Sequence, residues 1–272
     1  MNRQVVQLMV LRKIMKENKE NMERIGDITI YNADCMEIMQ TLPNESIDAI
    51  ITDPPYGISY LSPWTDNHKK IANDGLDDFK YALPIWLKEF HRLLTPTGVA
   101  CCCCCGGGAT PVSQIFTLEL LKQGFYLIQT LIWDKKTIGL GWRYRPSYET
   151  ILVFSKSKDK YNWYTERKDV SNILRWNNII PQKGDHPTPK PVNLMRELIL
   201  LHTKEGQTVL EPFMGGGTTA VACAMEGRKC IGIEIDEGYY NISKKRITDA
   251  VANKSLFEPS EMEEKIQEET LF

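Results

Sequence analysis

The sequence predicts an α/β fold built on a doubly wound, mainly parallel β-sheet. Short apolar runs, typical of buried strands, alternate along the chain with longer segments of helical periodicity. Two of the apolar runs lead directly into a Pro-rich or a Gly-rich turn. With 272 residues the chain is long enough for one large α/β domain with an insert, or for two small domains.

Seven segments are expected to be strands, because each contains a short apolar run. In chain order they are residues 27–31, 46–52, 99–105, 125–133, 148–155, 207–211 and 229–234. The segment at 46–52 leads into two prolines, and the segment at 207–211 leads into a run of glycines. Helices between the strands imply that most of these strands run parallel.

Five longer segments are expected to be helices. They are residues 79–94, 111–122, 191–202, 216–226 and 237–251. In the first of them, the residues available for an apolar face are Tyr81, Ile85, Phe90, Leu93 and Leu94. The second opens with Pro111, a residue type that is favoured in the first turn of a helix.

The expected strand at 99–105 carries five consecutive cysteines, Cys101 to Cys105, of the eight in the chain. Successive side chains on a strand point to opposite faces, so these thiols cannot converge tetrahedrally on one metal ion. No second Cys/His pair has the spacing of metal ligands. We therefore expect small core residues, no bound metal, and free thiols in a reducing cytoplasm.

The main domain is expected to span residues 25–255. A helical extension precedes it at 1–24, where apolar and basic groups alternate, and either Met1 or Met22 can be the true start. An acidic tail follows at 256–272 and is expected to be mobile, because it holds six Glu and one Lys. No apolar run reaches the ~18 residues that a membrane span needs, and the N-terminus lacks a secretory signal.

Charge is distributed unevenly along the chain, although the formal net charge is only −2. Residues 134–190 hold twelve Lys and Arg and six Asp and Glu, so this segment is +6 and the rest of the chain is −8. Aromatic residues such as Trp142, Tyr144 and Trp163 are interleaved with the basic ones. A local basic face can bind phosphates. The alternative is a solvated loop region rich in lysine.

The first turn motif, Thr52-Asp53-Pro54-Pro55-Tyr56, can hold an exocyclic amine. The Asp53 carboxylate and the Pro54 carbonyl can accept the two amine hydrogens, which frees the nitrogen lone pair for attack. Proline's fixed φ and missing N–H stiffen the turn that aims this carbonyl. Tyr56 offers a stacking face for a base that has been flipped out of a duplex. As a bare string, the motif is also consistent with a turn that ends a strand.

The second turn motif is Glu211-Pro212-Phe213-Met214-Gly215-Gly216-Gly217-Thr218-Thr219. Its glycines allow a ligand to approach the backbone and allow a sharp reversal from strand to helix. One helix later Glu234 ends the next strand, where the ribose diol of a nucleotide cofactor would lie. A dinucleotide-dependent oxidoreductase is disfavoured, because its Gly-x-Gly-x-x-Gly turn is absent from the start of the chain.

Together the two motifs resemble those of DNA adenine-N6 methyltransferases, which use S-adenosylmethionine. Their order, with Asp53 to Tyr56 before the Gly-rich turn, resembles the circularly permuted β class of that family. The resemblance covers roughly residues 27–250. It implies a Rossmann-like sheet of seven strands, one of them antiparallel, with a small target-recognition insert. The chain departs from the family pattern at Glu211, where many members have Asp, and at Gly216, where many have Ser.

The resemblance also implies the roles of individual residues. The implied catalytic residues are Asp53, Pro54, Pro55 and Tyr56. The implied cofactor-binding residues are Asp34, Cys35, Lys190, Glu211, Phe213, Gly215, Gly217, Thr218, Thr219 and Glu234. Lys190 lies in the segment His186-Pro-Thr-Pro-Lys190-Pro191. This segment is similar to a family motif that closes over the methionine end of the cofactor. The resemblance implies that Lys190 pairs with the methionine carboxylate. Asp34 has a second interpretation as a helix N-cap, and both can be true.

Asp53 favours adenine as the target, because family members that act on cytosine N4 usually have Ser there. Chemistry at cytosine C5 is disfavoured, because no cysteine follows a proline. We therefore expect a site-specific methyltransferase of the restriction-modification type, acting on N6 of a flipped-out adenine in double-stranded DNA. Cytosine-N4 or RNA methylation on the same scaffold, and an inert DNA-binding module, are the alternatives.

Target recognition is expected in two segments, the basic region at 134–185 and the polar loop at 57–78. The candidate DNA-binding residues are Arg143, Arg145, Lys156, Arg167 and Arg175. We expect no metal and no membrane partner, and a homodimer is possible.

Overall fold

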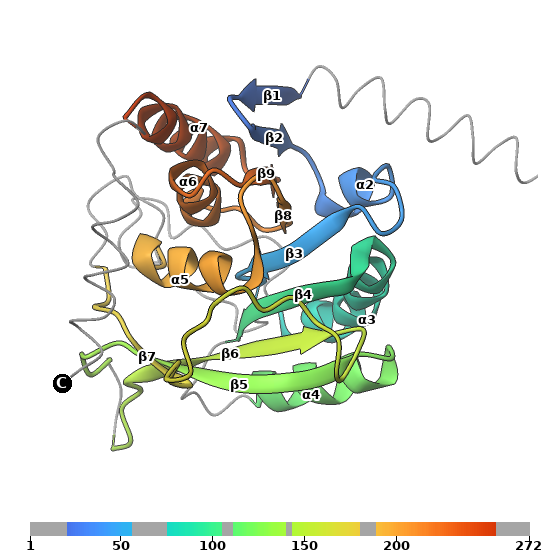
Figure 1. The fold of residues 1–272 in the computed structure, drawn as a ribbon, viewed down its shortest axis with the longest axis vertical. Coiled ribbons are helices and arrows are strands. Elements are labelled where there is room, and N and C mark those ends of the chain that lie inside the picture. Colours follow the sequence, from blue (N-terminus) through green and yellow to red (C-terminus); the bar gives the residue numbers. More distant parts are fainter. Residues whose placement is uncertain (1–20, 56–74, 105–110, 140–142, 180–188, 254–272) are drawn as a thin grey trace, which may run out of the picture.

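The computed structural model describes residues 21–55, 75–104, 111–139, 143–179 and 189–253. Within these residues the chain forms one nine-stranded sheet with helices on both faces (Figure 1). The expected α/β class is confirmed, and the described sheet has two more strands than the expected seven.

The helices and strands follow the expected alternation. In chain order they are β1 (Met22–Ile25), β2 (Ile28–Asn32), α2 (Cys35–Met39), β3 (Ile47–Thr52), α3 (Leu76–Leu93), β4 (Leu94–Cys104), α4 (Val112–Lys122), β5 (Tyr126–Asp134), β6 (Tyr148–Ser155), β7 (Ile173–Arg175), α5 (Val192–His202), β8 (Thr208–Glu211), α6 (Thr218–Met225), β9 (Lys229–Glu234) and α7 (Glu237–Ala252). The additional elements are β1, α2 and β7, all of them five residues or shorter.

The helical extension expected at residues 1–24 is wrong for residues 22–24. These residues belong to β1, which forms an antiparallel hairpin with β2. The turn of the hairpin is only two residues long, because Ile25 pairs with Ile28, and Gly26 adopts a φ of +61° in it. A glycine with positive φ suits such a short turn. Residues 1–20 lie outside the described part of the chain.

The strand order is β1-β2-β9-β8-β3-β4-β6-β5-β7. The strands β2, β9, β8, β3 and β4 run parallel to one another. Strand β6 is antiparallel to both of its neighbours, β4 and β5. The chain passes from β3 through α3 to β4 on one side, and from β8 through α6 to β9 on the other. The strand order therefore reverses between β3 and β8, which is where open α/β sheets bind their ligands.

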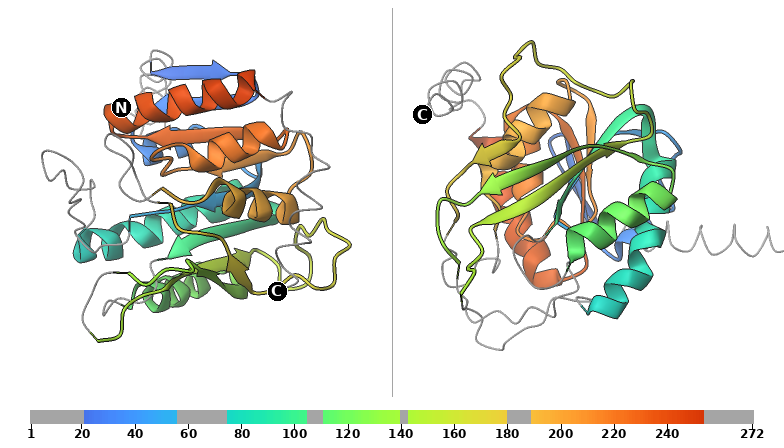
Figure 2. Two further views of the ribbon diagram at one scale, coloured as in Figure 1. Left: turned by 90° about the vertical axis from the view of Figure 1, so that its left-hand side faces the viewer. Right: turned by 90° about the horizontal axis from the view of Figure 1, so that it is seen from below.

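Each face of the sheet has its own apolar core. Helices α5, α6 and α7 cover one face, and α2, α3 and α4 cover the other (Figures 1 and 2). In β4, Cys101 and Cys103 pack into the first core, whereas Cys102 and Cys104 pack into the second. These four thiols are buried, as expected for small core residues. Cys105 lies outside the described residues.

The helices of the described residues lack the length and the apolar character that a membrane span requires. The described residues also contain no group of three or more His, Cys, Asp and Glu that would hold a metal ion.

Helix α3 is amphipathic, and its expected apolar face is confirmed only near its end, where Phe90 and Leu93 are buried, as is Leu94 at the start of β4. Tyr81 and Ile85 were expected to be buried, yet they are 78% and 40% exposed. The buried residues of the helix are Phe79, Leu83, Trp86, Leu87, Phe90 and Leu93. These six positions recur every three or four residues and form one continuous stripe, and Tyr81 lies outside it.

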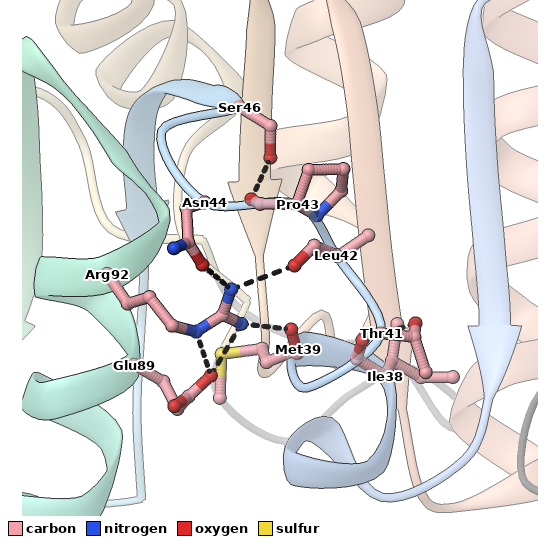
Figure 3. Close-up of polar contacts among 9 residues, drawn as sticks. All are labelled: Ile38, Met39, Thr41, Leu42, Pro43, Asn44, Ser46, Glu89 and Arg92. Carbon is pink, nitrogen blue, oxygen red and sulfur yellow. Dashed lines mark hydrogen bonds and ion pairs between the residues drawn. The ribbon is translucent and has the colours of Figure 1, made fainter. Parts of the chain in front are cut away.

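Arg92, in the last turn of α3, fastens the loop that leads into β3 (Figure 3). Its guanidinium donates to the carbonyl oxygens of Met39 and Leu42 at 2.7 and 2.9 Å. It also donates to Asn44 Oδ1 at 2.8 Å and to Glu89 Oε2 at 2.7 and 3.0 Å. These contacts join α2, α3 and the start of β3 at one edge of the sheet. The opposite end of β3 carries Asp53.

Candidate active site at the carboxyl edge of the sheet

The two motifs found in the sequence lie side by side at the carboxyl edge of the parallel strands. Asp53 directly follows β3, and Glu211 is the last residue of β8. These strands are parallel neighbours, with Ile50 opposite Leu210. Because the carboxyl ends of parallel strands meet at one edge, Asp53 and the Gly-rich turn flank the point where the strand order reverses.

The rest of the Pro-rich motif is described only in part. Pro54 is buried and Pro55 is half-buried. Tyr56 lies outside the described residues, so its expected stacking role stays a prediction.

Glu211 is a buried carboxylate that connects the two motifs. It is 3% exposed. One oxygen accepts from the Thr52 hydroxyl and, at 3.1 Å, from the Phe213 N–H, while the other accepts from the Thr219 hydroxyl at 2.8 Å. Burial raises the pKa of Glu211 to about 7, and these hydrogen bonds counteract part of the rise. Both oxygens accept from the protein itself, so Glu211 supports the turn, and the cofactor contact that the resemblance implied stays a prediction.

The Gly-rich turn is a compact support for the start of α6. Gly217 has a φ of +78°, and a Cβ at this position would lie 2.7 Å from the Cβ of Ser243 on α7. The Gly216 carbonyl accepts a hydrogen bond from Arg246 of α7. No side chain caps α6 within the described residues, so backbone N–H groups of its first turn are available to an anion or a polar ligand.

Several residues of this turn that were predicted to bind the cofactor pack against or hydrogen-bond to other residues of the protein. The Phe213 ring packs edge-on against Trp86 of α3, with 4.7 Å between the ring centroids. Thr218 and Thr219 are buried. The Gly215 N–H donates to Glu234. These contacts fix the backbone of the turn, which is the part that a nucleotide cofactor would approach.

Glu234 lies at the end of β9 and holds the turn in position. Its two oxygens accept from the Gly215 N–H at 2.7 Å and from the Asp236 N–H at 2.8 Å. Burial raises the pKa of Glu234 above its ordinary value, and the backbone hydrogen bonds oppose that rise. A carboxylate offers about four acceptor sites. Glu234 can therefore hold the turn and still accept from a ribose hydroxyl.

Asp34 caps α2, as its second interpretation predicted. Its carboxylate accepts from the Met36 N–H at 2.7 Å. Burial, followed by the charge of Asp34, raises the pKa of the neighbouring Cys35 thiol to about 12, so the thiol is neutral. The side chain of Asn32 donates to the Glu234 carbonyl at 2.9 Å and ties this segment to the end of β9.

Asp53 is part of a chain of alternating charges. Asp53 Oδ2 lies 2.5 Å from Lys190 Nζ, which also lies 3.2 Å from Glu149 Oε2. The other oxygen of Glu149 lies 2.5 Å from Lys135 Nζ. The structure thus pairs Lys190 with protein carboxylates, which differs from the expected contact with the methionine carboxylate of the cofactor.

The ion pairs stabilise the two buried groups, Lys190 and Glu149, in their charged forms. Burial opposes the charge of Lys190, but Asp53 and Glu149 outweigh it and raise the pKa of Lys190 above its ordinary value. Burial likewise opposes the charge of Glu149, but Lys190 and Lys135 outweigh it and lower the pKa of Glu149.

Three of the predicted DNA-binding residues lie at the same edge as Asp53. Strand β5 ends and β6 begins there, so Arg143 and Arg145 in the connecting segment lie at this edge, and both are exposed. Arg145 donates to the Gly139 carbonyl at 2.6 Å, which helps to shape the segment. Arg175 is exposed at the end of β7, opposite Asp134 at the end of β5.

Lys156, another predicted DNA-binding residue, lies away from these arginines. Strand β6 runs antiparallel and carries Lys156 to the amino edge of the sheet, where it lies 3.5 Å from Glu45, just before β3. Arg167 pairs with Asp169 at 3.2 Å and lies near Glu197 of α5. The described part of the basic region, residues 134–139 and 143–179, is therefore split between two edges and contains β6, an internal strand of the sheet.

Sequence reasoning missed three residues that support this site. Thr52 was quoted only as part of the motif, although its hydroxyl holds Glu211. Glu149 and Lys135 were counted only as charges. Glu149 carried a usable signal, because it is an acid inside the otherwise apolar segment Tyr148-Glu-Thr-Ile-Leu-Val-Phe-Ser155. A buried acid in a strand requires a partner.

A carboxylate after one central parallel strand and a Gly-rich turn after its neighbour define a nucleotide-cofactor enzyme of the Rossmann-like class. A family model described as DNA methylase matches residues 47–245. The chain belongs to this family of N6 and N4 DNA methylases, and it is a DNA methyltransferase.

Relatives and solved structures agree with this assignment. The type II methyltransferase M.HinfI of Haemophilus influenzae is 31% identical over 90% of this chain and 74% of its own length. M2.DpnII of Streptococcus pneumoniae is 28% identical over 80% of this chain and 88% of its own length. The crystal structure of an M1.HpyAVI–SAM complex matches with a TM-score of 0.60 at 28% identity, covering 81% of this chain and 99% of that one.

Proposed function

We propose that this protein is a site-specific DNA methyltransferase that methylates N6 of an adenine in double-stranded DNA, with S-adenosylmethionine as the methyl donor. The observation that carries the proposal is the position of Asp53. It directly follows β3 and lies beside the Gly-rich turn that follows β8, so an acceptor for an amine and a site for the methyl donor lie next to each other.

The residues at this edge act on the amine by accepting its hydrogen atoms. An exocyclic amine is a weak nucleophile, because its lone pair is delocalised into the ring. The Asp53 carboxylate and the Pro54 carbonyl accept the two hydrogens and favour a pyramidal nitrogen. Acceptors that are fixed in advance are effective, because they need little reorganisation during the reaction. Tyr56 provides the aromatic face for the flipped base.

The Gly-rich turn fits the proposed methyl donor. When bound, S-adenosylmethionine would supply a sulfonium methyl group: the amine nitrogen would bond to this methyl group, the sulfur would keep the electrons of the broken bond, and the amine would release one proton to water. Gly215 and Gly217 let the ligand approach the backbone, and Glu234 accepts from the ribose. Asp34 and Cys35, after β2, lie at the same edge and line the adenine side of the ligand.

The nature of the acceptor favours adenine over cytosine. Asp53 brings a full negative charge, whereas the cytosine-N4 members of the family usually have Ser at this position. The PvuII cytosine-N4-specific methyltransferase shares the fold with a TM-score of 0.62 at 19% identity, so the scaffold by itself does not discriminate between the two bases. Cytosine N4 is therefore the second candidate, and RNA is the third.

The DNA is proposed to dock along the carboxyl edge. Arg143, Arg145 and Arg175 supply positive charge there, and phosphate contacts of this kind position a duplex without reading its sequence. The loop expected at 57–78 is shorter than predicted, because residues 76–78 belong to α3, and residues 57–74, which lie outside the described part of the chain, complete the recognition surface in this proposal. The order of the motifs along the chain favours the permuted β class, and sedimentation of the purified protein tests the possible homodimer.

The decisive experiment uses purified protein, S-adenosylmethionine and an unmethylated plasmid. We expect N6-methyladenine at one short sequence, mapped by sequencing that detects modified bases, and no product with an Asp53→Asn variant. Matched reactions with RNA and analysis of N4-methylcytosine test the two alternatives. Methyl groups on cytosine alone would contradict the proposal.

A further inference from the structure

We propose that Lys190 is a positioning residue for methyl transfer: its ammonium holds the Asp53 carboxylate in place and in its ionised form, and Glu149 holds Lys190. This inference rests on the proposed function, because it concerns the carboxylate that accepts from the target amine. It replaces the role in cofactor binding that the motif around Lys190 suggested.

The first argument is the geometry of the charges. Lys190 Nζ lies between Asp53 Oδ2 at 2.5 Å and Glu149 Oε2 at 3.2 Å. Lys135 approaches Glu149 from the other side at 2.5 Å. The four groups come from separate segments: Asp53 after β3, Lys135 after β5, Glu149 within β6 and Lys190 before α5. The arrangement is therefore a product of the whole fold, which brings these segments together at one edge.

The second argument is burial. The side chains of Lys190 and Glu149 are 6% and 10% exposed, whereas that of Asp53 is 21% exposed. A buried ammonium is costly unless it is paired and hydrogen-bonded. If Lys190 turned away toward the carboxylate of a bound cofactor, Asp53 or Glu149 would lose this charged partner. The ion pairs within the protein therefore favour a fixed Lys190.

The third argument is the charge of the surrounding groups. Lys135 neutralises Glu149 from its far side. Burial raises the pKa of the Cys103 thiol on β4 well above its ordinary value, so this neighbour contributes no charge. Glu211 on β8 adds negative charge near Asp53 when it is ionised. Lys190 is thus a cation in direct contact with Asp53, and it favours the ionised carboxylate against the negative charge of Glu211.

The consequence for the reaction concerns orientation and protonation. An ammonium at one oxygen limits the rotation of the Asp53 carboxylate, and preorganised acceptors stabilise the transition state most effectively. An ionised carboxylate accepts hydrogen bonds only, whereas a protonated one also donates. A protonated Asp53 would therefore present a hydrogen of its own to the amine, and that oxygen would no longer accept a hydrogen bond from the amine.

The test compares Lys190→Met, Lys190→Arg and Glu149→Gln with Lys122→Met. Lys122 is a matched control, because it is a lysine in an ion pair with Glu119 on the surface of α4. For each protein, kcat is measured as a function of pH at saturating DNA and cofactor. The affinity for S-adenosylhomocysteine is measured by calorimetry, and folding by circular dichroism.

We expect Lys190→Met to lower kcat by at least ~10-fold while the affinity for S-adenosylhomocysteine stays within ~3-fold. The acidic limb of its kcat profile should move to higher pH, because the cation that favours the ionised Asp53 is gone. Glu149→Gln should move that limb to lower pH, because Lys190 then no longer shares its charge with Glu149. Lys190→Arg should recover part of kcat, and Lys122→Met should match the wild type.

A general loss of stability would not shift the acidic limb of the kcat profile in opposite directions in Lys190→Met and Glu149→Gln. Wild-type kcat with an unshifted acidic limb in Lys190→Met would overturn the inference. A loss of cofactor affinity at unchanged kcat would also overturn it, because that result would indicate that Lys190 binds the cofactor carboxylate. If Lys190→Met does not fold, the Glu149→Gln profile decides, and an absent shift or a shift to higher pH overturns the inference.

Failure of the proposed function can be recognised separately. The methylated base is identified by mass spectrometry in the same reactions. Methyl transfer to cytosine or to RNA would contradict the adenine proposal, while kcat and its acidic limb could still be measured on that substrate. If the wild type transfers no methyl group, the Asp53 carboxyl carbon can be titrated by NMR. A midpoint that does not rise in Lys190→Met then overturns the inference.

Discussion

The hydroxyl of Thr52 donates a hydrogen bond to the carboxylate of Glu211 and so joins the last residue of β3 to the last residue of β8. Asp53 follows Thr52, and the Gly-rich turn follows Glu211. The acceptor for the amine and the turn for the cofactor therefore share one buried support. Thr219 in the first turn of α6 contacts the same carboxylate, which extends the support into the helix.

This buried support predicts a dependence of stability on pH. Burial raises the pKa of Glu211 from 4.5 to about 7. The native state then binds this proton more tightly than the unfolded state does. The contribution of Glu211 to stability is full below about pH 4.5 and is lost as the pH rises through about 7. The free energy of unfolding, relative to Glu211→Gln, should fall by on the order of 3 kcal/mol across this range. Urea unfolding at several pH values measures it, and a constant difference between the two proteins would contradict the prediction.

Asp53→Ala should abolish methyl transfer, because the amine loses its charged acceptor. The affinity for S-adenosylhomocysteine should stay within a few-fold of the wild type, since the Gly-rich turn is supported by Glu211 and Glu234. Transfer of a labelled methyl group to DNA measures the first quantity, and calorimetry measures the second. Near-wild-type turnover in this variant would exclude the proposed mechanism.

Glu234→Ala should weaken binding of S-adenosylhomocysteine by at least ~10-fold, since hydrogen bonds to a charged acceptor contribute roughly 1.5–3 kcal/mol each. Glu234 also holds Gly215, so a loss of affinity could arise from the turn alone. A cofactor analogue that lacks a ribose hydroxyl separates the two causes. Wild type should discriminate against the analogue and Glu234→Ala should not. If both proteins discriminate equally between the cofactor and the analogue, the ribose does not bind to Glu234.

The combined change Arg143→Ala and Arg145→Ala should weaken DNA binding without changing the affinity for the cofactor. Both arginines are exposed at the carboxyl edge, and each phosphate contact that is lost should reduce the salt dependence of binding. Lys156→Ala is the matched control, because this lysine lies at the amino edge beside Glu45. Titrations at several salt concentrations measure the effect. Equal losses in both variants would place the DNA elsewhere.

The run of cysteines should bind no metal. Cys101 and Cys103 face one core and Cys102 and Cys104 face the other, so the four thiols do not converge. Elemental analysis of purified protein should find no stoichiometric zinc, and a non-reducing gel should show no obligatory disulfide. One tightly held metal ion per chain would overturn this prediction.

The local pattern of the sequence was sufficient for much of the fold. Short apolar runs such as residues 148–155 and 229–234 match strands of the structure. The pattern failed where its period was ambiguous, as in α3, where Tyr81 is exposed and Phe79 is buried. It also missed β7, because a three-residue strand becomes ordered only by pairing with β5.

The sequence by itself determined the two turn motifs and the strands that end at them, since hydrophobic periodicity and the backbone limits of Pro and Gly act locally. Only the tertiary structure decided which charges meet. Lys190 and Asp53 are 137 residues apart and lie 2.5 Å from each other. Lys156 is close in sequence to Glu149 but lies at the opposite edge, because β6 runs antiparallel. Charge pairing depends on strand order and direction, and these emerge only when the sheet is assembled.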